Sequence, residues 1–330
     1  MKHLPVNRNN TTETHESQYL STLSPRHEAW DIHRSEAQDV EATYREIRWP
    51  AFQNIADHIR NCSGYLGFAL VPDENGEEKL KLTRVYFCRA RYCPVCQWRR
   101  QLVLKARFCE AVEHVYEHMP EVRWVFLTLT VKNVPIETLR DSIKDMNAAW
   151  LRLMRRKDVK GILGWAKAVE VTRGSDGKAH PHFHILLMVR PSYFKGQNYI
   201  SQRKWTQMWR ECMKLDYTPI VHVQAVKNNE KKAIAELMKY SVKPSDLVKD
   251  AEWLMDLTTQ TKNLRFISFG GELRKTFKFL RDLEKHLGNT DEMTFVDEDE
   301  EGVDIDMSLK NLEPEVWFSW SRKARKYVLY

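Results

Sequence analysis

The sequence lacks any long apolar segment. No run of 18 or more apolar residues occurs in the 330 residues, which excludes a membrane-spanning helix. The first twenty residues contain no apolar segment of the kind that a secretory signal needs, so we expect a cytoplasmic protein. No internal repeat is present. With 42% hydrophobic and 29% charged residues, the composition is that of a soluble globular protein with an ample core.

Basic side chains are absent from residues 291–306, which hold nine aspartate or glutamate residues. The whole chain has 52 Lys and Arg against 45 Asp and Glu, and setting aside those nine acids raises the net charge from +7 to +16. The strong positive charge of the chain outside this segment favours a polyanionic partner such as nucleic acid. The alternative is a basic protein that has no polyanionic partner. We expect the acidic segment to be a solvated linker; the alternative is that it mimics DNA and folds back.

The distribution of polar and apolar residues divides the chain into five parts. Residues 1–48 are predicted to be a mobile polar arm, in which residues 36–46 could form a helix, and residues 49–120 a cysteine-rich lobe. A regular domain is predicted over residues 121–250, followed by a helical extension over residues 251–289. Residues 290–330 are predicted to be the acidic linker and a basic aromatic C-terminus.

Within the domain predicted over residues 121–250, hydrophobic periods of two alternate with periods of 3.6, which predicts the order β-α-β-β-α-β-α. The predicted strands are 122–132, 164–173, 181–189 and 219–226, and the predicted helices are 135–156, 201–213 and 229–243. The first six elements match the split βαβ, ferredoxin-like arrangement. We therefore predict an α+β fold with an antiparallel sheet and helices on one face, preceded by a small lobe.

The strand predicted over residues 181–189 carries histidines at alternate positions. Residues two apart on a strand project to the same side, so His180, His182 and His184 share a face. Two imidazoles about 7 Å apart along a strand can converge on one divalent ion. We choose His182 and His184 as ligands; His180 could ligate, bind phosphate or be structural. The alternative is a set of surface histidines without a metal.

Glu170 is the candidate carboxylate ligand for the same ion. If the hairpin between the two strands is centred on Asp176, Glu170 lies opposite His182 and faces the same way. The five-residue loop 174–178 is an acceptable length for such a hairpin. A shift of one residue would turn Glu170 to the other face, so the prediction depends on the register.

The helix predicted over residues 229–243 carries a candidate nucleophile. Glu236, Tyr240 and Lys243 would form one row, because residues three and four apart are neighbours on a helix. A free tyrosine has a pKa near 10 and reacts poorly, but a nearby lysine or a bound cation favours the phenolate. Lys243 could equally hold a phosphate, and Pro244 would end the helix. The alternative is a structural tyrosine beside an ordinary Glu–Lys pair.

Four of the six cysteines are bunched: Cys62, Cys88, Cys93 and Cys96. In a cytoplasmic chain this bunching favours metal binding over disulfides, and four thiolates suit a closed tetrahedral zinc site. A redox role for the last two fits less well, because no thioredoxin-like βαβ unit surrounds them. Basic and aromatic residues flank the cluster, and we predict DNA contacts for Arg89, Arg91, Arg99 and Arg100. The alternative is that these arginines only form the solvent-exposed face of a helix.

Together these motifs resemble those of rolling-circle replication initiators of bacterial plasmids, members of the HUH endonuclease superfamily with a single catalytic tyrosine. Three segments occur in the order of that family: 126–130 (FLTLT), 180–184 (HPHFH) and 240–243 (YSVK). The segment 88–100 (CRARYCPVCQWRR) resembles the one that precedes the nuclease domain in this plasmid family. The resemblance covers roughly residues 60–245 and implies that the regular domain is an HUH endonuclease.

The resemblance implies a metal-dependent, site-specific DNA strand transferase. Glu170, His182 and His184 would hold Mg²⁺ or Mn²⁺ against the scissile phosphate. Tyr240 would attack that phosphate, form a 5′-phosphotyrosine bond and free a 3′-hydroxyl primer. Because no second tyrosine follows in a Tyr-x-x-x-Tyr array, Glu236 could activate a water for the terminating cleavage. Zn²⁺ would be structural.

The partners implied are plasmid origin DNA, both as a duplex and as an exposed single-stranded loop, together with a host helicase and polymerase, and no membrane. Two other interpretations remain. One is a non-catalytic zinc DNA-binding protein that regulates copy number. The other is a relaxase or single-tyrosine transposase with the same nuclease chemistry, against which the upstream cysteine lobe favours plasmid replication.

Overall fold

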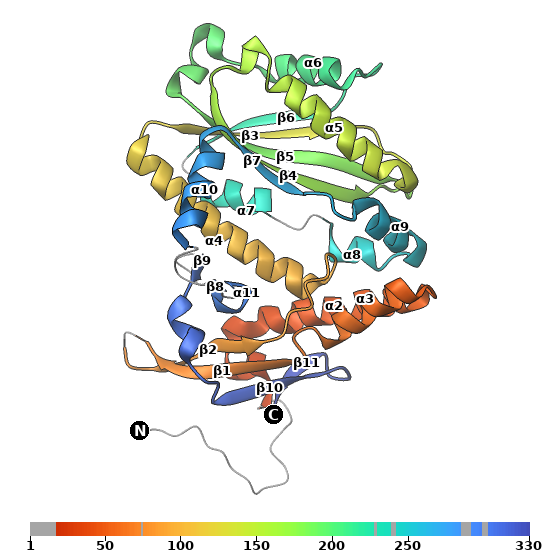
Figure 1. Cartoon of the computed structure of the whole chain (residues 1–330), viewed down its shortest axis with the longest axis vertical. Helices are drawn as coiled ribbons and strands as arrows, with labels where there is room; N and C mark the ends of the chain where they lie inside the picture. The colour runs from red at the N-terminus through yellow and green to blue at the C-terminus, as the bar shows by residue number, and fades with distance from the viewer. Residues whose placement is uncertain (1–17, 74, 228–229, 239–241, 285–291, 299–302) are drawn as a thin grey trace, which may run out of the picture.

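The molecule contains a five-stranded and a four-stranded antiparallel sheet, with the long helix α4 (Pro94–His118) crossing the space between them (Figure 1). The computed structural model describes residues 18–73, 75–227, 230–238, 242–284, 292–298 and 303–330. Within those ranges no helix is both long enough and apolar enough to cross a membrane.

The larger sheet has the strand order β6-β3-β5-β4-β7, and every neighbouring pair is antiparallel. Its strands are β3 (Arg123–Thr130), β4 (Ile162–Arg173), β5 (Ala179–Val189), β6 (Val221–Val226) and β7 (Ile267–Gly270). The first four lie within a few residues of the predicted strands. Their order is that of the predicted split βαβ arrangement, so this part of the prediction is confirmed. Strand β7, which was not predicted, extends the sheet at the β4 edge.

Helices α5 (Leu139–Leu153) and α6 (Gln202–Met213) cover one face of the larger sheet, at the top of Figure 1. Their fully buried Trp150 and Trp209 pack in the same hydrophobic core as Phe183 of β5. Both helices were predicted, because their apolar residues recur with the helical period. These contacts hold the helices against the sheet.

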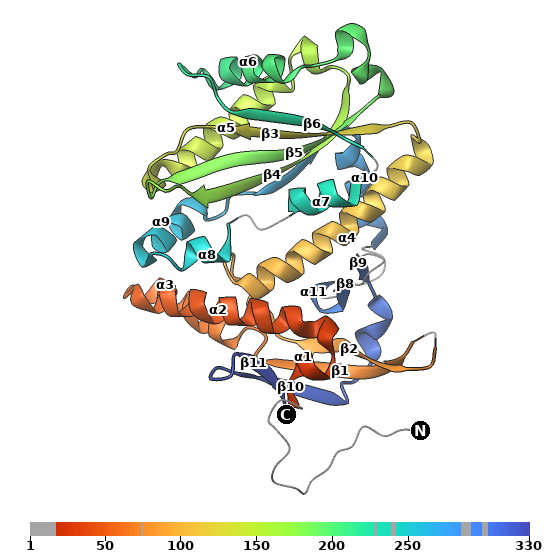
Figure 2. The ribbon, with the colours of Figure 1, turned by 180° about the vertical axis from the view of Figure 1, so that it is seen from behind.

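The opposite face of the sheet is also covered, by α4, α7 (Glu230–Met238) and α10 (Gly271–Glu284) (Figure 2). Leu186 and Met188 of β5 are buried there in a second core. The prediction of helices on one face only is therefore wrong. The reason is that β5 continues beyond His184 with apolar residues on both faces, and a strand that is apolar on both faces needs cover on each.

The smaller sheet has the order β11-β10-β1-β2 and joins the two ends of the chain. Its strands are β1 (Tyr65–Pro72), β2 (Glu78–Val85), β10 (Val316–Ser321) and β11 (Lys326–Leu329). The Tyr327 hydroxyl donates to the Ser63 carbonyl at 2.6 Å, and its backbone N–H donates to Asp31 at 2.8 Å. The C-terminal strands thus belong to the cysteine-rich lobe, unlike the predicted division into consecutive parts.

The predicted mobile arm, residues 1–48, is largely helical where the structure describes it. The helices of this region are α1 (Leu20–Leu23) and α2 (Glu28–Glu46), followed by α3 (Pro50–Asn61). Trp30, Val40 and Tyr44 of α2 are buried. The helix predicted near residues 36–46 lies within α2. The prediction of a mobile arm is wrong for α2, because a few apolar residues on one side of a polar helix suffice to anchor it. Residues 1–17 lie outside the described part.

The remaining elements are short. They are α8 (Pro244–Leu247), α9 (Ala251–Thr261), α11 (Glu292–Phe295), β8 (Val296–Glu298) and β9 (Val303–Ile305). Single 3-10 turns occur at Pro25–His27, Ile136–Thr138, Lys157–Val159, Pro191–Phe194, Gly196–Asn198 and Met307–Asn311. Because α11, β8 and β9 pack on α4, the described residues of the predicted acidic linker are part of the fold.

Lys167 is a lysine buried in the core between β4 and α5, with only 3% of its surface exposed. Its Nζ donates a hydrogen bond to Asn147 Oδ1 at 2.6 Å and lies 3.8 Å from the centre of the Phe183 ring. Burial lowers the pKa of Lys167 from its ordinary value of 10.5 to about 7, because the charged form is poorly solvated there. The folded state therefore binds this proton less tightly than the unfolded state does.

We expect Lys167→Met to remove a pH dependence of stability. The wild-type free energy of unfolding should be lowest below pH 7 and rise as the pH increases toward 10.5, because only the unfolded state keeps the proton in that window. Relative to the variant, the wild type should gain roughly 3 kcal/mol between about pH 7 and about pH 9.5. Urea unfolding of both proteins across this range measures the difference, and parallel curves would contradict the prediction.

Candidate active site and metal sites

Glu170, His182 and His184 form a compact group on the face of the larger sheet that α4, α7 and α10 cover. In the β4–β5 hairpin Glu170 lies directly opposite His182, as predicted for a hairpin centred on Asp176. Glu170 Oε2 lies 3.0 Å from His182 Nε2 and 2.7 Å from His184 Nε2. The three side chains are 5%, 9% and 8% exposed, in that order. The predicted register is confirmed.

The sheet also holds the second nitrogen of each imidazole. His182 Nδ1 lies 3.2 Å from the His180 carbonyl oxygen, and His184 Nδ1 lies 3.3 Å from Thr128 Oγ1. Such contacts fix the orientation of a histidine ring, here with both Nε2 atoms directed at Glu170. All three ligand atoms lie within 4.8 Å of one another. The group could hold one divalent ion and leave coordination positions for a phosphate oxygen or water.

His180 contributes to this group through its backbone. Its carbonyl oxygen contacts His182 Nδ1, and the two rings lie 5.3 Å apart. Burial lowers the pKa of His180, so its imidazole is neutral at neutral pH. The structure thus places the His180 backbone, rather than its imidazole, in contact with His182.

The predicted nucleophile, Tyr240, lies outside the described residues, which break between Met238 and Val242. The helix that precedes it, α7, packs on β4, β5 and α4. Leu237 and Met238 of this helix are buried, whereas Glu236 is exposed. The predicted helix is therefore present as far as Met238, on the sheet face that carries the histidines.

Lys243 does not belong to the helix predicted over residues 229–243. Its backbone is extended, with φ −68° and ψ 136°, and it is the N-cap of α8, which begins at Pro244. The prediction that Glu236, Tyr240 and Lys243 form one helical row is therefore wrong for Lys243. The reason is local, because a residue that precedes proline is disfavoured in the helical conformation. The Lys243 side chain is exposed.

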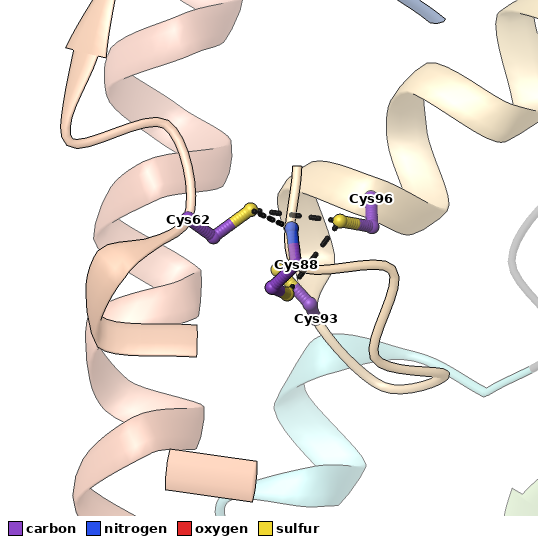
Figure 3. A group of neighbouring side chains, drawn as sticks. All are labelled: Cys62, Cys88, Cys93 and Cys96. Carbon is purple, nitrogen blue, oxygen red and sulfur yellow. Dashed lines mark hydrogen bonds between the residues drawn. The ribbon is translucent and has the colours of Figure 1, made fainter. Parts of the chain in front are cut away.

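The four bunched cysteines meet between the end of α3 and the start of α4 (Figure 3). The Sγ atom of Cys96 lies 3.5 Å from that of Cys62 and 3.7 Å from that of Cys88. Together with Cys93, the N-cap of α4, all four sulfurs lie within 4.8 Å of one another. A tetrahedral zinc–thiolate site separates its sulfurs by about 3.8 Å. The cluster therefore has the donor set and spacing of a closed tetrahedral metal site.

Backbone N–H groups point at two of these sulfurs. Cys88 donates to Cys62 Sγ at 3.4 Å, and Arg89 donates to Cys96 Sγ at 3.3 Å. The second bond goes with a positive φ of 57° at Arg89. Hydrogen bonds from the Cys62, Cys88 and Cys93 thiols and from the Arg89 N–H lower the pKa of Cys96. The lowered pKa favours the thiolate form of Cys96, which is the form that binds metals.

One of the four arginines predicted to bind DNA, Arg99, has a structural role instead. It is 4% exposed and lies over the Trp30 ring. Its guanidinium donates hydrogen bonds to the carbonyl oxygens of Met293, Thr294 and Val296. The prediction is wrong for Arg99, because its guanidinium hydrogen bonds hold the beginning of the acidic segment against α4.

The other three predicted arginines, Arg89, Arg91 and Arg100, line one cavity beside the start of α4. Sequence reasoning missed two residues near the candidate sites. Thr128 contacts His184 and lies within the FLTLT segment, so its alternate position on a strand was an available signal. Gln97 lines the cavity and gave no signal of its own.

A further group of possible ligands, His114, Glu117 and His118, lies on α4. His114 and Glu117 are 3.5 Å apart, and the two histidine rings are 4.5 Å apart. Their i, i+3, i+4 spacing in the sequence places them on one side of a helix, but they were not predicted as a metal site. Glu117 and His118 are exposed, and His118 Nδ1 is already engaged by the His114 carbonyl oxygen.

The fold and the sites define a mixed α+β protein in which a thiolate cluster and a histidine–carboxylate group could each hold a metal ion. A family model described as "Replication protein" matches residues 79–328. The chain therefore belongs to the Rep_1 family of replication proteins, the family of plasmid rolling-circle replication initiators. The resemblance inferred from the motifs is confirmed at this level.

Similar proteins from several bacteria match most of the chain. Protein rep of Lentilactobacillus hilgardii is 33% identical over 292 residues, which cover 83% of this chain and 88% of that protein. Protein rep of Bacillus amyloliquefaciens is 33% identical over 319 residues, covering 89% and 90%. Protein rep of Streptococcus pneumoniae is 36% identical over 234 residues, covering 68% and 72%. No solved structure matches the chain significantly.

We expect the thiolate cluster to bind zinc. Purified wild-type protein should contain about one zinc ion per chain, whereas Cys93→Ser should lose most of it. The variant should also unfold at a lower temperature, because binding a structural metal contributes to folding free energy. Elemental analysis and thermal unfolding measure both effects. Cys212→Ser, which removes a buried cysteine of α6 outside the cluster, should keep its zinc, and equal zinc in all three proteins would contradict the assignment.

Glu170→Gln should weaken Mn²⁺ binding at the histidine–carboxylate group by at least about tenfold, because the amide keeps the shape but loses the ligand charge. Titration calorimetry with Mn²⁺ on the zinc-containing protein measures this affinity. Glu137→Gln makes the same change at an exposed position and should bind as wild type does. Identical affinities of the two variants would rule out Glu170 as a ligand.

Proposed function

We propose that this chain initiates plasmid rolling-circle replication by nicking one strand of its double-stranded origin with Tyr240. One observation carries the proposal: Glu170, His182 and His184 converge on the sheet face against which α7 packs. Helix α7 ends at Met238, two positions before Tyr240 in the sequence. Membership of the replication-protein family supports the same reaction.

The arrangement of the larger sheet supports an HUH nuclease fold for the domain predicted over residues 121–250. The order β6-β3-β5-β4 places β5 in the interior of the sheet, between β3 and β4. The two histidines lie on this interior strand and the carboxylate on its neighbour, so both strands are held on each side. A site built on rigid interior strands keeps its geometry better than one built on loops.

The residues of the histidine–carboxylate group fit Mn²⁺ or Mg²⁺, since these three buried side chains offer two imidazole nitrogens and one carboxylate oxygen. When bound, the ion supplies Lewis-acid polarisation of the scissile phosphate. Glu170, His182 and His184 would hold it. Thr128 and the His180 carbonyl would keep the two imidazoles in the ligating orientation.

In the proposed reaction the Tyr240 hydroxyl oxygen attacks the scissile phosphorus. The phosphorus–oxygen bond to the 3′ side breaks, a 5′-phosphotyrosine bond forms, and the departing 3′ oxygen takes up a proton as the phenol loses one. Lys243 offers a positive charge that would favour the phenolate or hold the phosphate. One ester bond replaces another, so the strand can later be rejoined, and the free 3′-hydroxyl primes synthesis.

The reaction assigns partners and supporting roles. Origin DNA would be bound as a duplex and cleaved in an exposed single-stranded loop. In the cytoplasm a host helicase would then separate the strands, and a host polymerase would extend the primer. The four thiolates would hold a structural Zn²⁺. The positive charge of the chain outside residues 291–306 supports binding to DNA.

Tyr240→Phe should abolish the covalent protein–DNA adduct while leaving DNA affinity within about twofold, because it removes only the attacking oxygen. The measurement is incubation with labelled single-stranded oligonucleotides tiled across the plasmid origin, with Mn²⁺ or with EDTA, followed by a denaturing gel and peptide mapping. Tyr199→Phe, at an exposed tyrosine of another segment, is the matched control.

A metal-dependent adduct on Tyr240 would establish both the reaction and the nucleophile. Tight binding by the wild type with no adduct on any tyrosine in the presence of Mn²⁺ would instead favour a non-catalytic DNA-binding regulator.

Glu236→Ala should nick normally but fail to release the strand at the end of a round. Glu236 lies on α7 four residues before Tyr240, is exposed, and is the candidate base for the water of the terminating cleavage. A plasmid carrying two tandem origins measures both steps, since failed termination yields multimeric single strands. Unchanged termination by the variant would exclude this role.

A further inference from the structure

A cavity of about 510 Å³ lies between the start of α4 and the β4–β7 edge of the larger sheet. Its polar wall comes from α4 and the loop before it, with Arg89, Arg91, Gln97, Arg100 and Gln101. Its other wall is apolar and includes Phe266 and Phe269 at β7. The volume is within the range of pockets that hold small organic molecules. The two walls suit a ligand with one anionic side and one flat apolar side.

Three guanidinium groups line the cavity, and no carboxylate lies among the described residues that line it. Arg91 is held in place, because it donates to the Leu264 carbonyl at 2.8 Å and its guanidinium lies 4.8 Å from the Phe266 ring centre. Guanidinium groups bind phosphate through paired hydrogen bonds, and they stack on flat rings. The polar wall therefore suits a phosphate group.

Gln97 supplies an independent indication of a ligand. Its Nε2 donates to the Arg91 carbonyl at 2.8 Å, which fixes the orientation of the amide. The Oε1 atom is buried and has no hydrogen-bond partner among the described residues, and the side chain is only 8% exposed. A buried acceptor without a donor is unfavourable. The occupant of the cavity that Gln97 lines could supply the missing N–H or O–H.

The cavity adjoins the candidate active site. Ala168, which lines it, is paired with His184 and lies two residues before Glu170 on the same face of β4. Met238, the last residue of α7, also lines it and stands two positions before Tyr240 in the sequence. Two residues along a strand span about 7 Å. A DNA strand with its scissile phosphate at the metal group could therefore place a neighbouring nucleotide in the cavity.

We propose that this cavity binds one nucleotide of the origin strand next to the scissile phosphate. The guanidinium groups of Arg91 and Arg100, together with Arg89, contact its phosphate. A base-edge N–H donates to Gln97 Oε1, and the base lies against the apolar wall. This proposal rests on the proposed function, of which it names a substrate contact.

The cysteine cluster then acts as the support of this nucleotide site. Arg89 follows Cys88 and donates its backbone N–H to Cys96 Sγ, and Gln97 follows Cys96 directly. The backbone that carries the polar wall is thus held by the sulfur cluster. In this proposal the cluster links the small lobe to the bound DNA strand through Arg89 and Gln97 and does not contact the reacting atoms.

The test is binding of fluorescent single-stranded origin DNA to the full chain in buffer without divalent ions, where no cleavage occurs. Arg100→Ala should weaken binding about tenfold and lower the slope of log affinity against log salt concentration by about 0.7, as for one lost phosphate contact on a single strand. Arg100→Lys should recover the slope but only part of the affinity, because lysine keeps the charge without the planar fork. Duplex DNA of the same sequence should be affected much less.

Arg203→Ala is the matched control, because it removes one arginine from an exposed position on α6, across the sheet from the cavity. Equal affinity of Arg100→Ala and Arg203→Ala would overturn the proposal, and so would an equal loss on single strands and duplex. Neither result would disturb a metal-dependent adduct on Tyr240, so the proposed function is tested separately.

A second variant tests the base contact. Replacing single bases of the strand by abasic sites should reveal a position where wild-type affinity falls about tenfold. In Gln97→Met, which lacks the acceptor, the loss at that position should be clearly smaller. Identical abasic profiles in the two proteins would overturn the assignment of Gln97. Thermal unfolding and zinc content of each variant show that the site is otherwise intact.

Discussion

The register of the β4–β5 hairpin is the constraint on which the candidate active site depends. Glu170 meets His182 and His184 only because it lies opposite His182, and the loop sets that alignment. Asp176 Oδ1 accepts from the Lys178 backbone N–H, and Gly177 takes the positive φ that the turn requires. A slip of one residue would also turn Phe183 out of the core under α5 and α6 and turn His182 and His184 into it. Core packing thus enforces the ligand geometry.

The long helix α4 connects the two candidate metal sites. Cys93 and Cys96 lie at its N-terminal end, where the thiolate cluster forms. Farther along, Phe108 and Val112 pack in the second core against Trp124 of β3, on the sheet face that bears the histidines. One rigid element therefore spans the distance between a site that stabilises the fold and a site that could carry out chemistry. The nucleotide cavity lies beside the first turns of this helix, between the two.

Arginine side chains have two different roles in this molecule, one structural and one available to a ligand, and the composition does not distinguish them. Arg99 is buried, and its guanidinium donates hydrogen bonds to carbonyl oxygens of the acidic segment. It therefore does not contribute to a surface that could bind DNA. Its neighbour Arg100 instead lines a cavity next to the candidate active site. The two residues are adjacent in the sequence, but on a helix adjacent residues point about 100° apart. Helix orientation, rather than the number of basic residues, decides which of them can reach a ligand.

Local sequence determined four of the five strands of the larger sheet, β3 to β6, together with the hairpin register, the grouping of Glu170 with the histidines, and the cysteine cluster. Each follows from alternation, turn residues or short spacing within a few dozen residues. Features that depend on contacts between segments far apart in the sequence were decided only by the tertiary structure. The second helical layer, the strand β7, the pairing of the C-terminal strands with β1 and the burial of α2 all join segments far apart in the chain. Hydrophobic periodicity states which side of an element is apolar, but the surface that covers it is set by packing of the whole chain.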